Sequence, residues 1–348
     1  MIRIHHSYGD TKVLDNVSFT VPAGELVCLL GPSGSGKTTL LRIAAGLEKL
    51  QAGTISIDEE VIAEPAYQLP PEERKIGYMF QDYALFPHLS IIDNVMFGLF
   101  RHDKVNALKR AMEMLDQVGM VKHAHRYPHM LSGGQQQRVA LVRALAPEPR
   151  LVLLDEPFSD LDTNMRARIR EETLNVLKQT NVATLMVTHD PEEAMFMADR
   201  IKVLGDNGKV LQTGRPADIY YKPVDEYVAR LFGPMNMISG VVEAGALRSS
   251  FGDIAVEDER DGVAVRALIR PEGVILSDGD GSQGGAPVDV LSAHLLGDSS
   301  LVRCQIREGV NTGVEFQVRI PGTFDPAEMG QIWARVDPRH TFVYSDKS

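Results

Sequence analysis

Residues 25–47 read ELVCLLGPSGSGKTTLLRIAAGL, and this stretch decides the fold class. The apolar run at its start, ended by a glycine, is typical of a strand buried on both faces. GPSGSGKT, from Gly31 to Thr38, matches the phosphate-loop pattern, and a helical pattern follows it. A strand, a glycine-rich loop and a helix in this order predict a phosphate-binding turn within an α/β fold.

Strands and helices alternate along the first two thirds of the chain. The apolar runs that share the character of the first are IGYMF (76–80), LVLL (151–154) and TLMVT (184–188), and the helical patterns include NALKRAMEMLDQVGM (106–120) and MRARIREETLNVLKQT (165–180). This alternation predicts a largely parallel core sheet. Beyond residue 235 short alternating segments replace the helical pattern, which predicts a small β-barrel-like domain over 236–348.

Bulk composition is that of a globular protein. The 348 residues suit two domains, and the formal net charge of −11 argues against a general binder of the nucleic-acid backbone. Two cysteines, Cys28 and Cys304, indicate no disulfide framework and fit a reducing compartment. The N-terminal residues lack the apolar core of a signal peptide, and no apolar run approaches the ~18 residues of a membrane span. If the protein acts at a membrane, we expect it to act from the cytoplasmic side, through a partner protein.

The phosphate loop carries its chemistry in three kinds of residue. Its glycines let backbone N–H groups close around phosphate, and the helix that follows adds the positive end of its dipole. Lys37 can reach the β- and γ-phosphates, and the hydroxyl of Thr38 can bind Mg²⁺. A chance glycine-rich turn is the alternative, and the flanking strand and helix argue against it.

Polar residues follow three further apolar runs. Ligands of open α/β sheets lie beyond the carboxyl ends of the strands. There, Asp155 can hold Mg²⁺ through water, and Glu156 can orient or deprotonate an attacking water. His189 can contact the γ-phosphate, and Gln81 can bind Mg²⁺ and sense the water. Taken alone, the two carboxylates could be a solvated surface pair and Gln81 an ordinary loop residue. The presence of the phosphate loop favours a catalytic site over these alternatives.

A second candidate anion site lies in YPHMLSGGQQQRVALVRAL, residues 127–145. Ser132 is a plausible N-cap, and Gly133 and Gly134 expose backbone N–H groups at the start of a helix. One nucleotide could touch both loops of one chain. Alternatively, two chains could each lend this loop to the other's nucleotide in a two-fold dimer. The residues themselves do not choose between these arrangements.

Together these motifs resemble those of the ATP-binding subunits of ABC transporters, over essentially the whole chain. The resemblance implies that LSGGQ contacts ATP across a dimer and that the segment SDLD (159–162) is the D-loop. The implied catalytic residues are Lys37, Gln81, Glu156 and His189, and the implied Mg²⁺ ligands are Thr38, Gln81 and Asp155. The implied nucleotide-binding residues are Tyr8, which stacks on adenine, Gly31, Ser33, Gly34, Gly36, Lys37, Thr38, Thr39, Ser132, Gly133, Gly134 and Gln135.

The same resemblance implies an architecture and partners. Residues 1–235 would form a P-loop ABC ATPase domain with a helical subdomain at about 85–150, and 236–348 an OB-like, β-rich regulatory domain. ATP and Mg²⁺ would be the cofactors. The partners would be a second copy of the chain, two membrane permease subunits that dock near Leu85, Phe86 and Pro87 and, indirectly, a solute-binding protein, but no nucleic acid. The chain would lie peripherally on the cytoplasmic face of the cell membrane.

The segments TGRPADIYYKP (213–223), FGPMNMISG (232–240) and IRPE (269–272) resemble importers of the maltose, sulfate, spermidine and iron group. RYPHMLSGGQQQR (126–138) and ALAPEPRLVLLDEPFSDLD (144–162) resemble iron(III) importers most. The expected function is therefore ATP hydrolysis that powers solute import, with iron(III) as the favoured solute. The alternatives are another solute such as sulfate, polyamine or sugar, a soluble ABC ATPase acting on nucleic acid or translation, and a regulatory module that binds ATP without turnover.

Overall fold

A computed structural model describes residues 1–99, 103–256, 259–279 and 284–346. It divides into two compact units, Met1–Ile219 and Tyr220–Ser348. The division lies N-terminal to the domain boundary expected at 235/236. The reason is helix α8 (Glu226–Arg230), whose residue Ala229 packs against Leu268 and Phe342 of the second unit.

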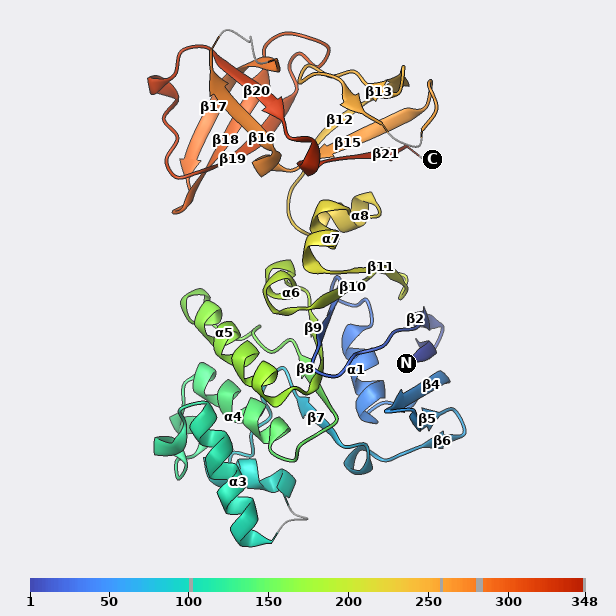
Figure 1. The fold of residues 1–348 in the computed structure, drawn as a ribbon, viewed down its shortest axis with the longest axis vertical. Helices are drawn as coiled ribbons and strands as arrows, with labels where there is room; N and C mark the ends of the chain where they lie inside the picture. Colours follow the sequence, from blue (N-terminus) through green and yellow to red (C-terminus); the bar gives the residue numbers. More distant parts are fainter. Residues whose placement is uncertain (100–102, 257–258, 280–283, 347–348) are drawn as a thin grey trace. The chain divides into compact units, whose positions relative to one another are not determined.

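The centre of the first unit is a six-stranded sheet (Figure 1). Its five neighbouring parallel strands place their carboxyl ends at one edge, as the apolar runs predicted, and a sixth strand pairs antiparallel. Every residue of β3 is buried, which explains its unbroken apolar sequence. In spatial order the strands are β11 (Val210–Gly214), β10 (Arg200–Leu204), β3 (Leu26–Leu30), β9 (Ala183–Thr188), β8 (Leu151–Asp155) and β7 (Ile76–Met79).

A second, antiparallel sheet of the first unit lies on the other side of helix α1 (Lys37–Ala45). Leu40 and Ile43 of α1 belong to one buried cluster with Leu14 of the second sheet and Leu153 and Leu185 of the core sheet. This packing holds the helix, and the loop before it, between two sheets. The strands of the second sheet are β2 (Thr11–Val17), β1 (Ile2–Tyr8), β4 (Ala52–Ile57), β5 (Glu60–Glu64) and β6 (Tyr67–Gln68).

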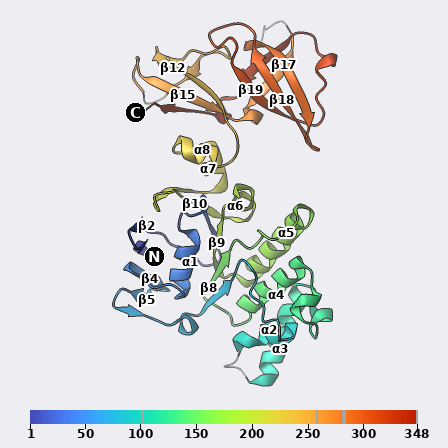
Figure 2. The same ribbon diagram turned by 180° about the vertical axis from the view of Figure 1, so that it is seen from behind.

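Helices α2 (Ile91–Met96), α3 (Lys104–Gln117), α4 (Gly133–Leu145) and α5 (Thr163–Thr180) gather away from α1, as both ribbon views show (Figures 1 and 2). Helix α6 (Pro191–Met197) contacts α5 and strands β3 and β9 of the core sheet. The 3₁₀ turns lie at Pro71–Glu73, Phe97–Leu99, Val121–His123 and Pro128–Met130. Helices α2, α3 and α4 contact one another, and α4 also contacts β7 and α5. Among the described residues, no helix has the length and apolar character needed to cross a bilayer.

The second unit is built from two five-stranded antiparallel sheets that share one apolar core. This confirms the prediction of a β-barrel-like fold. Helix α7 (Pro216–Tyr221) leads into it, and 3₁₀ turns lie at Pro271–Gly273, Pro326–Glu328 and Pro338–His340. The first sheet contains β14 (Ile254–Ala255), β13 (Ala246–Leu247), β12 (Asn236–Glu243), β15 (Ala264–Ile269) and β21 (Thr341–Ser345); the second contains β16 (Val274–Asp278), β20 (Ile332–Val336), β17 (Ala286–Leu295), β18 (Ser299–Ile306) and β19 (Glu315–Pro321).

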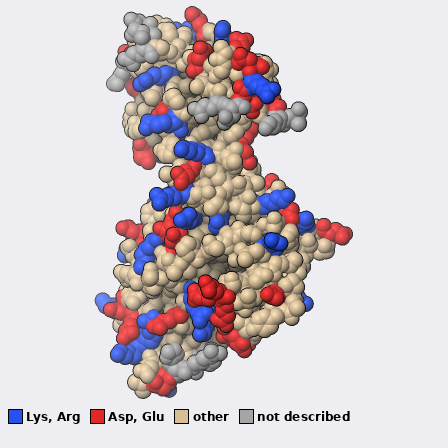
Figure 3. Space-filling model, turned by 45° about the vertical axis from the view of Figure 1, so that its right-hand side comes forward, with Lys and Arg blue, Asp and Glu red and all other residues tan. Residues whose placement is uncertain are grey.

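Charges of both signs are interspersed on the face drawn in Figure 3. Lys and Arg alternate there with Asp and Glu on each unit, rather than gathering into one broad basic stripe. A binder of the nucleic-acid backbone usually presents such a stripe. On this face, charge therefore gives no support to a nucleic-acid partner.

Candidate nucleotide and catalytic site

The phosphate loop connects β3 to α1. Gly34 and Gly36 have φ angles of 85° and 94°, in the region that favours glycine. A Cβ atom on Gly36 would lie 2.8 Å from the carbonyl oxygen of Val13, so this position also excludes side chains for lack of space. No side chain caps the N-terminus of α1. The loop therefore ends in backbone N–H groups that are free to meet an anion.

Lys37 is held inside this loop. Its side chain is buried, and its ammonium group donates hydrogen bonds to the carbonyl oxygens of Gly31 (2.9 Å) and Pro32 (2.7 Å). Burial lowers the pKa of Lys37, while the nearby charges of Glu156 and Asp155 oppose that change. A strongly hydrated cation is thus already desolvated where the loop would meet phosphate.

Asp155 is the best-connected carboxylate of the sheet edge. Its Oδ1 accepts a hydrogen bond of 2.9 Å from the hydroxyl of Thr38, and its Oδ2 accepts one of 2.9 Å from the phenol of Tyr78. Burial raises the pKa of Tyr78, and the charge of Asp155 adds to that shift. Sequence reasoning missed Tyr78, which is polar only at its tip and lies within an apolar strand.

Glu156 and His189 form the second pair of the site. Nδ1 of His189 lies 2.9 Å from Oε2 of Glu156. The backbone of Glu156 has a φ of 43°, an uncommon conformation for a residue with a Cβ atom, and its N–H donates to the carbonyl oxygen of Val187 on β9. The neighbouring strand holds the strained turn, and the turn aims the Glu156 carboxylate at His189.

The structure therefore brings most of the expected catalytic residues to one edge of the core sheet. The phosphate loop follows β3, Asp155 ends β8, and His189 follows β9 directly. Gln81 follows β7 at the same edge and is exposed in a turn. This is the edge at which open parallel sheets bind ligands.

Tyr8 lies at the end of β1, on the second sheet. Its ring is half exposed, as a stacking surface for a flat ligand requires, and it meets the ring of His6 edge-on. Its hydroxyl donates a hydrogen bond of 3.2 Å to Glu48. The Tyr8 side chain is thus held at its hydroxyl, while about half of its surface stays exposed.

The segment from Ser132 to Gln135 opens α4 with a capping box, in which the Ser132 backbone N–H donates to Oε1 of Gln135 at 3.0 Å. Gly133 is exposed, whereas Gly134 is buried, and a Cβ atom on it would lie 2.7 Å from Met165 of α5. In the part of the chain that the structure describes, the hydrogen bonds of Ser132 and Gln135 do not reach the phosphate loop. The two candidate anion sites are not joined by hydrogen bonds within one chain.

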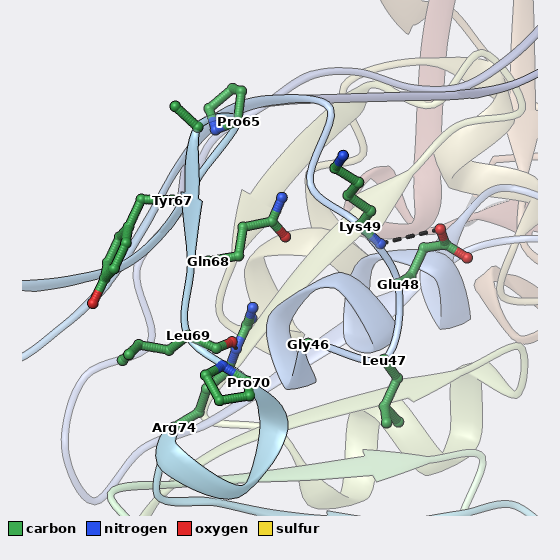
Figure 4. Close-up of a pocket in the computed structure, with 11 residues that line it drawn as sticks. Gly46, Leu47, Glu48, Lys49, Pro65, Tyr67, Gln68, Leu69, Pro70 and Arg74 are labelled. Atoms are coloured by element: carbon green, nitrogen blue, oxygen red, sulfur yellow. Dashed lines mark hydrogen bonds between the residues drawn. The ribbon is translucent and has the colours of Figure 1, made fainter.

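A hollow of about 440 Å³ lies at the opposite end of α1 from the phosphate loop (Figure 4). Arg74 borders it and is almost fully buried. Its guanidinium donates hydrogen bonds to the carbonyl oxygens of Ile43, Ala44 and Leu69, each at 2.8 Å. Arg74 therefore satisfies the carbonyl end of α1 and ties it to the segment before β7.

Comparison with known proteins identifies the family. Residues 14–159 match the ABC transporter family model. An iron(III) import ATP-binding protein of Pectobacterium atrosepticum is 41% identical over 277 residues, which cover 79% of this chain and 80% of the relative. A sulfate/thiosulfate import ATP-binding protein of Chromobacterium violaceum is 45% identical, covering 77% of this chain and 73% of the relative. The putrescine transport ATP-binding protein of Escherichia coli is 40% identical, covering 89% and 85%.

A solved structure resembles the chain over its ATPase part. It is a dimeric ATP-binding cassette in a post-hydrolysis state bound to ADP and Pi, with a TM-score of 0.53 and 32% sequence identity. The match covers 62% of this chain and 96% of the solved one. Relatives of this identity and coverage, together with the phosphate loop at the sheet edge, show that the chain belongs to the ABC transporter family, as an ATPase subunit of its importer group.

Proposed function

We propose that two copies of this chain hydrolyse ATP at their shared interface and so drive import of iron(III) through membrane permease subunits. The observation that carries the proposal is the pair Glu156–His189, 2.9 Å apart, at the same sheet edge as the Thr38–Asp155 pair. One pair suits the handling of water and the other the binding of a divalent cation. Their common edge gives hydrolysis of a nucleoside triphosphate a plausible geometry.

The nucleotide would be held from its phosphates to its base. The backbone N–H groups of Gly34 and Gly36 and the start of α1 would surround the phosphates, and Ser33 and Thr39 flank them on the same loop. A side chain on Gly36 would collide with Val13 of β2, so the loop needs glycine at this position. Lys37 would turn from its carbonyl partners to the β- and γ-phosphates. The half-exposed ring of Tyr8 would stack on adenine.

Magnesium would bind at Thr38 and Asp155. Mg²⁺ prefers oxygen ligands and keeps several waters, and the Thr38 hydroxyl and the Asp155 carboxylate supply oxygens already 2.9 Å apart. The exposed amide of Gln81 would complete the protein ligands. When bound, the ion would neutralise charge that develops on the phosphate oxygens.

Water would be handled by the second pair. The Glu156 carboxylate would accept a proton from the attacking water, and His189 would hold that carboxylate in place through Nδ1 and contact the γ-phosphate through its other ring nitrogen. The strained φ of 43° at Glu156 fixes the direction of its side chain. Little covalent chemistry is required beyond this positioning.

The dimer would complete the site. The Ser132–Gln135 segment offers backbone N–H groups at the start of α4 and, among the described residues, makes no hydrogen bond to its own phosphate loop. In the two-chain arrangement it would meet the partner's nucleotide, so that each site uses both chains. The related cassette that was solved with ADP and Pi is a dimer, which supports this arrangement.

A groove beside the site suits a permease. It has a volume of about 660 Å³, it is mostly apolar, and Tyr78, Phe80, Phe86 and Phe97 are among its lining residues. Arg143 fixes its wall by donating to the carbonyl oxygens of Tyr83 and Ala84, at 2.8 and 2.7 Å. A helix of a membrane subunit in this groove would touch the turn that carries Gln81. Docking there would attach the chain peripherally to the cytoplasmic face of the membrane. A solute-binding protein would be an indirect partner, through the permease.

The C-terminal unit would regulate transport. It has its own core and includes α8, so it can act as a separate module. Deletion of residues 220–348 should preserve ATP binding but alter dimerisation, uptake or its inhibition. Deletion from residue 236 instead should also expose the apolar face of α8 around Ala229. Unchanged dimerisation, uptake and inhibition after removal of the unit would refute a regulatory role.

The first test separates ATP binding from turnover. Glu156→Gln should bind ATP with Mg²⁺ as tightly as the wild type, hydrolyse it at least a hundredfold more slowly, roughly the contribution of a general base, and accumulate as a dimer in size-exclusion chromatography. Glu171→Gln, an exposed position on α5, is the matched control and should behave as the wild type. Wild-type turnover in Glu156→Gln would refute the proposed base.

The second test identifies the membrane subunits that bind this chain and the solute that they import. Tagged Glu156→Gln chain, trapped with ATP and Mg²⁺ in its native host, should retain polytopic membrane subunits that mass spectrometry identifies. Cells lacking the gene should lose uptake of radioactive iron(III) and keep uptake of sulfate and putrescine. Loss of one of the other solutes instead would reassign the cargo. Recovery of ribosomal or DNA-bound partners alone would refute the transport role.

A further inference from the structure

Arg166 lies in the first turns of α5, directly after the segment SDLD (159–162). Its Nη2 donates a hydrogen bond of 3.0 Å to the carbonyl oxygen of Leu161. Leu161 is buried, so this carbonyl has a fixed position at the end of the segment. The guanidinium of Arg166 therefore reaches back across the start of its own helix.

The other side of the Arg166 guanidinium faces the residue after His189. Its Nη1 lies 3.7 Å from Oδ2 of Asp190. Asp190 caps α6, because its Oδ1 accepts from the backbone N–H groups of Glu192 and Glu193. Arg166 thus joins the segment after Glu156 to the loop that carries His189.

These contacts close into a ring that passes through Glu156. From Glu156, the first contact is the hydroxyl of Ser159, which donates to the Glu156 carbonyl oxygen at 3.1 Å. The chain then runs to Leu161, across Arg166 to Asp190, and along the backbone to His189. His189 returns to Glu156 at 2.9 Å.

A buried anchor holds the far side of the ring. The hydroxyl of Thr188 donates to Oε2 of Glu193 at 2.6 Å and accepts from the backbone N–H of Asp190 at 3.0 Å. Thr188 and Glu193 are both almost fully buried. With the His189 loop fixed on this side, Arg166 provides the connection on the opposite side, toward the segment after Glu156.

We propose that Arg166 is a positioning residue for hydrolysis, which holds the His189 loop against the segment after Glu156 so that the Glu156–His189 distance is set before ATP binds. The inference rests on the proposed roles of Glu156 and His189. The alternative is an ordinary surface ion pair. Arg168, two residues further along α5, has that character, since its side chain is 75% exposed and it pairs with Glu172 on the same helix. The Arg166 side chain is 27% exposed and bonds outside its helix.

The test measures kcat and KM for ATP in the purified full-length wild type and its variants. Arg166→Gln should lower kcat by about tenfold, the effect of losing a charged hydrogen bond, and should leave KM and ATP affinity within about twofold because no phosphate contact is lost. Arg166→Lys should recover only part of the loss, since an ammonium lacks the fork that reaches both partners. Arg168→Gln is the matched control and should equal the wild type.

Asp190→Asn checks the route of the effect. Asparagine keeps the cap of α6 but loses the charge that faces Arg166. This variant should lower kcat by about threefold, as expected for a partly exposed pair, and its combination with Arg166→Gln should lower kcat no further than Arg166→Gln alone. If Arg166→Gln does not fold, Asp190→Asn alone tests the positioning role of Arg166.

Glu156→Gln in the same assay distinguishes a failure of the positioning role of Arg166 from a failure of the proposed function. If Glu156→Gln is inactive and Arg166→Gln and Asp190→Asn both turn over at the wild-type rate, the positioning role of Arg166 is wrong and the proposed function stands. If Arg166→Gln and Arg168→Gln lose the same activity, the effect is not specific to the ring and the role is also wrong. If Glu156→Gln turns over normally, the proposed function itself fails.

Discussion

The phenol of Tyr78 donates a hydrogen bond of 2.9 Å to Oδ2 of Asp155, the carboxylate whose Oδ1 accepts from Thr38. Tyr78 belongs to β7 and Asp155 to β8, so the bond crosses between neighbouring parallel strands. It fixes the orientation of the Asp155 carboxylate without occupying the oxygen that faces the phosphate loop. A hydrogen-bond partner that orients a metal ligand in this way tunes the affinity of the site for the metal.

Tyr78→Phe should therefore weaken binding of Mg²⁺. The phenylalanine ring keeps the packing, while Asp155 loses a partner and gains rotational freedom. The Mg²⁺ concentration at half-maximal ATPase activity should rise by about tenfold, the usual cost of removing such a partner, while kcat at saturating Mg²⁺ should stay close to the wild-type value. Tyr67→Phe, at an exposed ring far from this carboxylate, is the control. An unchanged Mg²⁺ dependence in Tyr78→Phe would contradict the orienting role.

Lys37→Ala should abolish hydrolysis by weakening phosphate binding. The ammonium group is already buried within the loop and needs only to exchange carbonyl partners for phosphate oxygens. We expect ATP affinity to fall by at least about tenfold, in line with the loss of a charged hydrogen bond, and ATPase activity to fall below detection. Lys104→Ala, exposed at the start of α3, should leave both unchanged. Isothermal titration calorimetry with ATP and Mg²⁺ measures the affinity, and tight binding by Lys37→Ala would contradict the assignment.

The core sheet and the candidate residues could be predicted because their signals are local. Strands such as β3 and β8 are buried on both faces and so appear as unbroken apolar runs. Polar residues directly after such runs are placed by topology at one edge. For this reason the sequence alone located Asp155, Glu156 and His189.

The second sheet and the supporting residues could not be predicted in this way. Strands β4 and β5 mix apolar residues with exposed glutamate and serine, and the pairing of β4 with β1 depends on residues far away in the sequence. Tyr78, Arg74 and Arg166 act through partners on other elements or beyond their own helix. No periodicity in the sequence marks such contacts.

Arg74→Gln should destabilise the first unit. Arg74 donates to three carbonyl oxygens, two of them at the end of α1, and glutamine is too short to reach all of them. The loss should be about 2–4 kcal/mol of unfolding free energy, since buried acceptors would lose their donors. Urea denaturation followed by circular dichroism measures it, with the exposed position Arg126→Gln as control. A change below about 0.5 kcal/mol, the usual size for surface substitutions, would show that water replaces the guanidinium.

Glu193→Gln should stabilise the protein at neutral pH. Burial raises the pKa of Glu193 and outweighs the opposing hydrogen bond from Thr188; the charge of Asp190 adds to the rise, while Arg170 and Arg166 oppose it. The folded state therefore favours the protonated carboxyl, so the free energy of unfolding falls as pH rises from the unfolded pKa of about 4.3 through the raised folded value. Glutamine stays neutral, and its amide oxygen can still accept from Thr188.

The gain from Glu193→Gln should be up to about 1 kcal/mol at neutral pH, within the range of single substitutions, and it should shrink toward the unfolded pKa. Denaturation curves across this range measure it. Glu192→Gln, whose side chain is 80% exposed on the same turn, should show no such pH dependence. If Glu193→Gln instead becomes less stable than the wild type as pH rises, the attraction of Arg170 and Arg166 for the charged carboxylate outweighs the cost of burying it. Glu193 would then be a buried anion, and its charge would help to hold the His189 loop.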